Sequence, residues 1–319
     1  MQFYGRFFIS LLVSLCIWLT LVFFQIGLPS RTSQWVDDVY KKKTVAAEKI
    51  ASQKILIVAG SNALFGVNSE LIEQQLKIKT INYSVNAGIF LPYVLYKAKQ
   101  VIKPGDIVLL PLEYSLYNYN GIPNSQMIDS IFSRDFEVFF ELTIREQFYV
   151  FWNVTFKRVY QGYQAQGGKE IKWGVYGVHH VDKRGDQTHT RLADRSQSMW
   201  DEINQLPGNL YGQEYSADAL AWDYLHDFIL WCHQQGAKCI FMPSTLMRFE
   251  SYLSDPKERW FYQNLASMVE KAGGVYIGDP YDYMYEKALY FNTDYHLIDE
   301  GRKMRTEQML LDLKARKEF

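Results

Sequence analysis

The chain has 319 residues, of which 48% are hydrophobic and 22% are charged, so it is long enough to bury one large core or two small ones. Its formal net charge is −1 and no stripe of lysine and arginine stands out, which gives no support to a nucleic-acid partner. Aromatic residues make up 16% of the chain, a share that suits a large core, a membrane interface or a surface that binds sugars or partners.

The first predicted element is an uncharged run at residues 7–30, bracketed by Arg6 and Arg31. As a helix it would be about 36 Å long, more than the roughly 30 Å hydrocarbon layer of a bilayer. Residues 25–31 (QIGLPSR) contain no small-X-small cleavage site, so we predict a retained signal anchor over residues 1–31. Basic residues stand on both sides of the run, so the charges alone do not orient it.

After the anchor, residues 32–53 are predicted to form a polar helix or stalk. Residues 54–319 alternate apolar strands with amphipathic helices, which predicts an α/β fold: one three-layer domain around a doubly wound parallel sheet. Several of the strands are continuous apolar runs of the kind found in a sheet covered on both faces. The five strand candidates are residues 54–59, 79–85, 106–112, 238–242 and 275–277.

The alternation lapses between the third and fourth strands, and we interpret residues 115–215 as an insertion. Its first part contains an aromatic stretch at residues 136–160, and polar loops with glycine follow. The aromatic stretch is predicted to be a lid, a membrane-surface helix or a partner surface. A helical hairpin packed on the core would show the same pattern.

Ser61 ends the first apolar strand and opens a helix in the sequence KILIVAGSNALFG at residues 54–66. A hydroxyl in such a turn projects past the carboxyl edge of the sheet, where the unpaired amides of the next helical turn also point. A nucleophile and an oxyanion site are therefore predicted to share this turn. The alternative is that Ser61 only caps the helix.

A serine nucleophile needs a histidine to take its proton and a carboxylate to orient the imidazole. His296 follows the last strand candidate, and Asp294 precedes it by two residues, so the pair is predicted to lie on a carboxyl-edge loop facing one crevice. The alternative is a loop histidine that caps carbonyl groups. A closing helix follows, with Met304, Leu311 and Ala315 as its predicted apolar face.

Three short blocks resemble those of the SGNH hydrolase superfamily. They are Gly60-Ser61-Asn62 after the first strand, Asn86-Ala87-Gly88 after the second, and Asp294 with His296 near the end. The superfamily includes a membrane-anchored branch that works with acyl-transfer membrane proteins in O-acylation of polysaccharide or teichoic acid. The resemblance covers residues 54–112 and 216–316 and implies a flavodoxin-like sheet that needs no cofactor.

The resemblance implies that Ser61 is the nucleophile and that the amides of Asn62 and Gly88 bind the oxyanion. Two departures stand out. One residue separates the aspartate from the histidine in the last block, where two are usual. The third block reads Pro111-Leu112-Glu113-Tyr114 and lacks the family asparagine, whose role falls to Asn86 or Asn118 or is missing.

Glu113 stands in this third block and is predicted either to bind substrate or to stabilise the loop. Asn118 is assigned to substrate binding as well.

The remaining sequence motifs give weaker information about function. No dinucleotide or phosphate-loop glycine motif is present. His179, His180 and His189 stand near acidic residues in a polar loop without metal-ligand spacing, so we predict substrate contact and no metal there. Cys232 and Cys239 are predicted to be either a disulfide or two buried free thiols.

These observations predict a single-pass protein of the bacterial inner membrane with its catalytic domain on the periplasmic side. The predicted reaction is transfer of an acyl group, acetyl foremost, to or from an envelope polysaccharide through a serine acyl-enzyme. A membrane-bound O-acyltransferase is the predicted partner. The alternatives are a carbohydrate or lipid esterase, and a non-catalytic protein that binds glycan or scaffolds a membrane acyltransferase.

Overall fold

The computed structural model describes residues 2–30, 33–164 and 174–316. The chain divides into two compact units. The helical unit comprises Met1–Asp37 and Ile122–Lys172, and the α/β unit comprises Asp38–Gly121 and Trp173–Phe319. The predicted insertion is therefore not one piece, because its first half groups with the N-terminal segment and its second half groups with the sheet.

The α/β unit is built on a five-stranded parallel sheet in the order β2-β1-β3-β4-β6. Each strand lies inside one of the five predicted ranges, and β1 and β3 are buried along their whole length, as expected for a covered sheet. The order reverses between β1 and β3, which is where doubly wound sheets open a crevice at their carboxyl edge. The strands are β1 Lys54–Ile57, β2 Lys79–Asn82, β3 Ile107–Leu110, β4 Lys238–Phe241 and β6 Val275–Tyr276.

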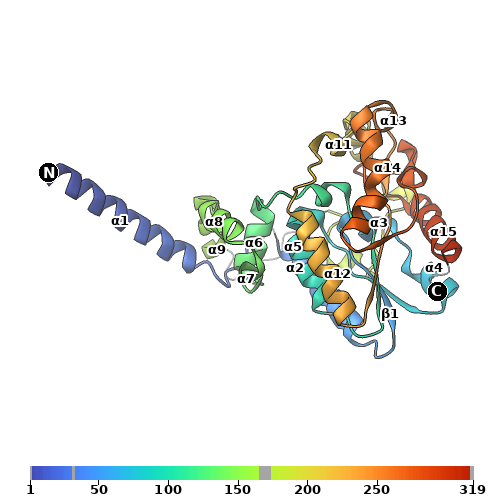
Figure 1. Cartoon of the computed structure of the whole chain (residues 1–319), viewed down its shortest axis with the longest axis horizontal. Helices are drawn as coiled ribbons and strands as arrows, with labels where there is room; N and C mark the ends of the chain where they lie inside the picture. Colours follow the sequence, from blue (N-terminus) through green and yellow to red (C-terminus); the bar gives the residue numbers. More distant parts are fainter. Residues whose placement is uncertain (1, 31–32, 165–173, 317–319) are drawn as a thin grey trace. The chain divides into compact units, whose positions relative to one another are not determined.

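Helices cover both faces of this sheet (Figure 1). On one face α15 packs against α3 and α4, and on the other α5 packs against α12, as right-handed crossovers require. The predicted α/β architecture is thus present. The helices are α3 Ser61–Gly66, α4 Ser69–Leu76, α5 Phe90–Lys99, α12 Ala221–Gln234, α14 Pro256–Lys271 and α15 Asp299–Ala315.

Smaller elements complete the α/β unit. Strands β5 (Leu246–Met247) and β7 (Met284–Tyr285) form a second, two-stranded parallel sheet. Three further helices are α10 Gln197–Gln205, α11 Tyr211–Glu214 and α13 Ser251–Ser254. Cys232 in α12 and Cys239 in β4 are buried free thiols, which answers the alternatives left open by the sequence.

The predicted stalk is a helix, α2 (Gln34–Glu48), but its second half is no free stalk. Val39 and Ala47 are fully buried, and the ring of Tyr40 lies 5.3 Å from that of Tyr83. The Thr44 hydroxyl is hydrogen-bonded to the Tyr83 hydroxyl at 2.8 Å. The polar composition of the segment concealed a helix face that packs on the sheet.

The closing helix α15 buries a different face from the predicted one. Met304 and Leu311 are 49% and 63% exposed, whereas Arg305, Met309 and Leu313 are buried. The apolar pattern selected the wrong stripe because one of the buried positions is an arginine. That arginine proves to be central to the Ser61 turn.

Among its described residues, the helical unit contains α1 (Gln2–Phe23) and four short helices. The segment Tyr4–Phe23 of α1 is long and apolar enough to cross a membrane and is almost entirely exposed. Phe132, Val150 and Val159 are buried inside the unit, and a capping box at Thr143 fixes the start of α8. The short helices are α6 Ser125–Ser133, α7 Val138–Glu141, α8 Ile144–Trp152 and α9 Phe156–Gln164.

Candidate active site

The Ser61 turn lies where the loops after β1, β2 and β3 come together. A Cβ atom at Gly60 would lie 2.3 Å from the amide nitrogen of Ala87 and 2.5 Å from Oε1 of Glu113. Only glycine tolerates so close an approach by backbone and carboxylate. The Gly60-Ser61-Asn62 block, the Asn86-Ala87-Gly88 block and the third block at Glu113 therefore meet at Gly60, directly before Ser61.

The Glu113 carboxylate holds this turn by accepting hydrogen bonds from two of the backbone amides of the turn. Its Oε2 accepts a hydrogen bond from the Gly60 amide and its Oε1 one from the Asn62 amide, both at 2.9 Å. The carboxylate thus binds the amides of the residues directly before and after Ser61. Burial raises the pKa of Glu113, and the hydrogen bonds from Asn62 and Gly60 oppose that rise. Of the two predicted roles, these hydrogen bonds are those of loop stabilisation, and substrate binding stays a prediction.

Arg305 supports the same turn from α15. Its guanidinium donates to the Asn62 carbonyl at 2.9 Å and to Asn62 Oδ1 at 2.8 Å, while Asn62 Nδ2 donates to the Pro111 carbonyl. Arg305 is fully buried; burial lowers its pKa, and the Glu113 carboxylate acts in the opposite direction. Asn62 therefore bridges a buried cation and a buried carboxylate.

His296 is placed beside the helix that Ser61 begins. Its ring is stacked on Phe65, with centroids 4.0 Å apart and planes 7° from parallel. Phe65 follows Ser61 by four residues in α3, so the two side chains lie on one face, about 6 Å apart along the helix axis. The structure thus brings the predicted nucleophile and base to the same helix from opposite ends of the chain.

Asn292, which the sequence reasoning missed, orients the imidazole. His296 Nδ1 is 2.8 Å from Asn292 Oδ1, and Asn292 Nδ2 donates to the Tyr176 hydroxyl at 3.1 Å. Since Oδ1 can only accept, Nδ1 carries the proton and Nε2 keeps its lone pair. Burial lowers the pKa of His296 to about 3, so the ring is neutral at pH 7.

Asp294 does not hold His296, contrary to the prediction. Its Oδ2 accepts a hydrogen bond from Asn209 Nδ2 at 2.6 Å, and burial raises its pKa. The reason is the local turn: the Thr293 hydroxyl accepts from the amides of Tyr295 and His296, which folds the loop and turns neighbouring side chains apart. The sequence signal that could have identified Asn292 is a side-chain amide four residues before His296.

Ser61 is half-buried, and its hydroxyl forms no hydrogen bond with His296 or with any other residue that the structure describes. Its neighbours among the predicted oxyanion donors are occupied. The Asn62 amide donates to Glu113, and the Gly88 amide donates to Asn86 Oδ1 at 2.7 Å. The oxyanion site predicted from Asn62, Gly88 and Asn86 is therefore not preformed in this conformation.

The loop after β2 is also strained. Phe90 has φ = 59°, a left-handed backbone conformation that is a genuine outlier for a bulky residue. It directly follows the 3-10 helix Ala87–Ile89, which carries the Gly88 amide. Strain of this kind is held in place by the surrounding structure and concentrates at functional sites.

Asn118, predicted to bind substrate, makes its side-chain hydrogen bond outside the Ser61 turn. Its Nδ2 donates to the carbonyl of Tyr211 in α11 at 2.9 Å. It shares no hydrogen bond with the loops that meet at Gly60 in the part of the chain described. Asn118 was considered as a replacement for the asparagine that the third block lacks, and its contacts do not support that role.

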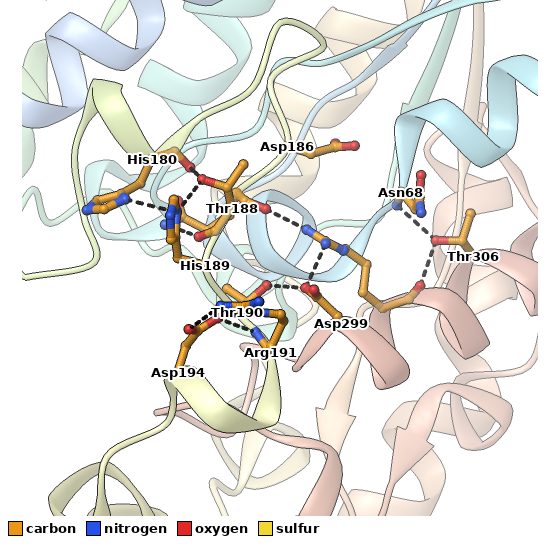
Figure 2. Close-up of polar contacts among 12 residues, drawn as sticks. Asn68, His180, Asp186, Thr188, His189, Thr190, Arg191, Asp194, Asp299 and Thr306 are labelled. Atoms are coloured by element: carbon orange, nitrogen blue, oxygen red, sulfur yellow. Dashed lines mark hydrogen bonds and ion pairs between the residues drawn. The ribbon is translucent and has the colours of Figure 1, made fainter.

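The polar histidine loop is fastened to α15 (Figure 2), and its Asp186 accepts hydrogen bonds from the amide and hydroxyl of Ser69 in α4. Thr190 donates to Asp299 at 2.6 Å, and Arg302 donates to the Gln187 carbonyl at 2.5 Å. His180 and His189 contact each other, and no group of three potential metal ligands occurs among the described residues. The loop begins with Tyr176, whose ring lies against Phe65 and His296. It therefore covers the imidazole.

No family model, curated protein or solved structure matches this chain.

Proposed function

We propose that this chain is a membrane-anchored, SGNH-like serine enzyme that moves an acyl group, acetyl foremost, onto or off an envelope polysaccharide. The observation that carries the proposal is the stacking of His296 on the helix that Ser61 begins, with Nδ1 held by Asn292. This arrangement leaves Nε2 as the proton acceptor, which is the tautomer that activates a serine hydroxyl.

In the proposed reaction Ser61 Oγ bonds to the carbonyl carbon of an ester and gives its proton to His296 Nε2. The tetrahedral intermediate then collapses; the ester C–O bond breaks, and the leaving alcohol takes the proton from the imidazolium. A sugar hydroxyl or water next attacks the acyl-serine, again with His296 as base. The second step releases the acylated product and regenerates Ser61.

Substrate binding must change two contacts for this to occur. Ser61 has to come within hydrogen-bond reach of His296 Nε2, about 2.6–3.2 Å. An oxyanion donor also has to be released. The amides of Asn62 and Gly88 are both held by side chains, and we assign the release to Gly88 because its loop is strained at Phe90. The Ser61 amide, at the first position of α3, supplies a second donor.

We further propose that α1 anchors the chain in the bacterial cell membrane, with the α/β unit on the periplasmic side. An enzyme that takes acyl groups from a membrane-embedded donor must stay near the bilayer, and a membrane-bound O-acyltransferase is the partner that fits this need. A membrane-impermeant maleimide tests the side: it should label Ser267→Cys, an exposed position on α14, in cells with a permeabilised outer membrane. Labelling only after the inner membrane is lysed would contradict this orientation.

The catalytic claim is tested by Ser61→Ala in the producing bacterium, with polymer acylation as the readout. We expect acylation to be lost at unchanged protein level, and Ser267→Ala, an exposed serine on a helix, to act as wild type. Unchanged acylation in Ser61→Ala would eliminate Ser61 as the nucleophile.

Two observations favour a second function: the Asn62 and Gly88 amides are occupied, and the Ser61 hydroxyl forms no hydrogen bond with His296. It is a non-catalytic glycan-binding or scaffolding role beside a membrane acyltransferase. A fluorophosphonate probe separates the two, because labelling at Ser61 requires an activated hydroxyl and refusal by the native protein favours the scaffold. If Ser61 is labelled, hydrolysis of a simple acetyl ester without a sugar acceptor distinguishes an esterase from a transferase.

A further inference from the structure

The helical unit exposes an apolar stripe on α8 and α9. Its side chains recur at helical spacing and are exposed by 49% to 86%. A soluble helix pair would turn such a stripe inward, but these helices already bury Val150 and Val159 on their other side. The aromatic stripe consists of Ile144, Phe148, Trp152, Phe156, Tyr160 and Tyr163.

The aromatic stripe is continuous with the exposed surface of α1. The ring of Trp18 in α1 lies 4.6 Å from that of Phe156 at the start of α9. Trp18 precedes the end of α1 at Phe23 by five residues, about 7.5 Å along the helix axis. Phe156 therefore lies alongside the apolar part of α1, at a depth within the ~5–10 Å to which interfacial helices bury their apolar face.

Buried polar contacts fasten α9 to the segment that follows α1. Arg158 donates to Gln25 Oε1 at 2.9 Å and to the Leu28 carbonyl at 2.8 Å, and it forms a buried ion pair with Asp129 of α6. Ser30 donates to the same aspartate at 2.6 Å. Because these groups are buried, opening the contact would leave charges unpaired, so the stripe cannot move away from α1 independently.

Gly162 shows how close this packing is. A Cβ atom there would lie 2.2 Å from Gln25 Oε1 and 2.7 Å from the Arg158 guanidinium. A larger residue at this position would displace the side chains that join α9 to the segment after α1. The position of the stripe along α1 is set by the fold of the helical unit.

We propose that α8 and α9 lie in the membrane interface, with the aromatic stripe buried at the boundary of headgroups and acyl chains beside the point where α1 leaves the bilayer. The inference rests on the proposed membrane crossing of α1. Lipid is the occupant that the structure favours, because the stripe continues the surface of α1 and because Trp and Tyr rings prefer this boundary. Arg145 and Lys157 are exposed on the same helices and suit lipid phosphate.

Spin-label accessibility in the full-length protein, purified and placed in lipid nanodiscs, tests this. Cys16 is replaced by Ala, the buried Cys232 and Cys239 are left in place, and single cysteines carry the label. Phe148→Cys and Tyr160→Cys report on the stripe, and Leu11→Cys reports on the middle of α1. Gln126→Cys, an exposed polar position on α6, is the matched aqueous control within the same unit.

We expect the ratio of oxygen collisions to nickel-chelate collisions at positions 148 and 160 to exceed the ratio at 126 several-fold and to fall below that at position 11. Labels at 148 and 160 that read like 126, while position 11 reads as lipid, would overturn the inference and leave the anchor intact. An aqueous reading at position 11 overturns the anchor itself. Spin–spin broadening at 148 that disappears on dilution with unlabelled protein would instead assign the stripe to a second copy of the chain.

Discussion

The Ser61 turn and the aromatic stripe break the usual distribution of side chains in opposite directions. Beneath Ser61, a glutamate and an arginine are buried, and each finds hydrogen-bond partners around Asn62. On α8 and α9, large apolar side chains are exposed, and polar ones hold the helices from the inside. Buried charged groups with hydrogen-bond partners fix the geometry of the Ser61 turn. Exposed apolar side chains on the helical unit need a partner from outside the unit to remove them from water.

The largest effect on stability is expected from Arg305→Met. It removes the buried guanidinium, leaves the Asn62 oxygens without donors and leaves the Glu113 carboxylate without a compensating charge. Loss of one buried partner typically lowers the free energy of unfolding by about 3–5 kcal/mol, to be measured by denaturant unfolding of the detergent-solubilised protein. Lys303→Met on the exposed side of α15 is the control, with a change within about 1 kcal/mol. Equal stability of the Arg305→Met and Lys303→Met variants would contradict a structural role for Arg305.

His296→Gln is expected to slow fluorophosphonate labelling of Ser61 by about 10²- to 10⁴-fold, because proton transfer to a positioned base contributes that much. The rate is measured as labelled fraction against time at pH 7. His233→Gln, exposed on α12, should label at the wild-type rate. A rate that His296→Gln leaves unchanged would remove His296 from the mechanism.

The low pKa of His296 has a consequence for pH. The ring is neutral in the folded protein down to about pH 3 and takes up a proton near pH 6.5 when unfolded, so the unfolded state binds more protons between these values. Wild-type stability relative to His296→Gln should therefore fall by about 2 kcal/mol between pH 7 and pH 5, at ~1.4 kcal/mol per unit below 6.5. Unfolding curves at the two pH values check this, and parallel pH dependence of the two proteins would argue against a buried neutral ring.

Asn292→Ala is expected to reduce the labelling rate of Ser61 by about two- to tenfold, the equivalent of one hydrogen bond of 0.5–1.5 kcal/mol. Asn292→Asp keeps an acceptor for Nδ1–H and adds a negative charge, so it should restore the rate and raise the pKa of His296, seen as an acid limb at higher pH. Asp294→Asn should leave the pH profile in place. A shift of the profile in Asp294→Asn but not in Asn292→Asp would reverse the assignment.

The smallest effect on stability is expected on the stripe. Phe148→Ser should change the free energy of unfolding in detergent by no more than about 0.5 kcal/mol, because the side chain is exposed. Phe132→Ala, in the buried core of the same unit, should lower it by about 3–5 kcal/mol. A large loss in Phe148→Ser would mean that the ring packs inside the unit and faces no lipid.

Local pattern was enough for some features. Apolar segments bounded by turn residues located the five strands of the larger sheet but not β5 and β7. The uncharged run at residues 7–30 located α1, although the helix ends at Phe23. Both patterns depend on neighbours in sequence. The position of Ser61 at the carboxyl edge followed from a strand that ends before a helix. These are properties that a chain segment carries with it.

The tertiary structure alone decided which polar groups meet. Whether Asn292 or Asp294 orients His296 depends on how the Thr293 turn folds, and the roles of Glu113 and Arg305 depend on loops and a helix distant in sequence that converge on Gly60. Hydrogen bonds require distances and angles that composition does not encode. The sequence determined the scaffold and the location of Ser61, and long-range packing decided the partners of the residues around it.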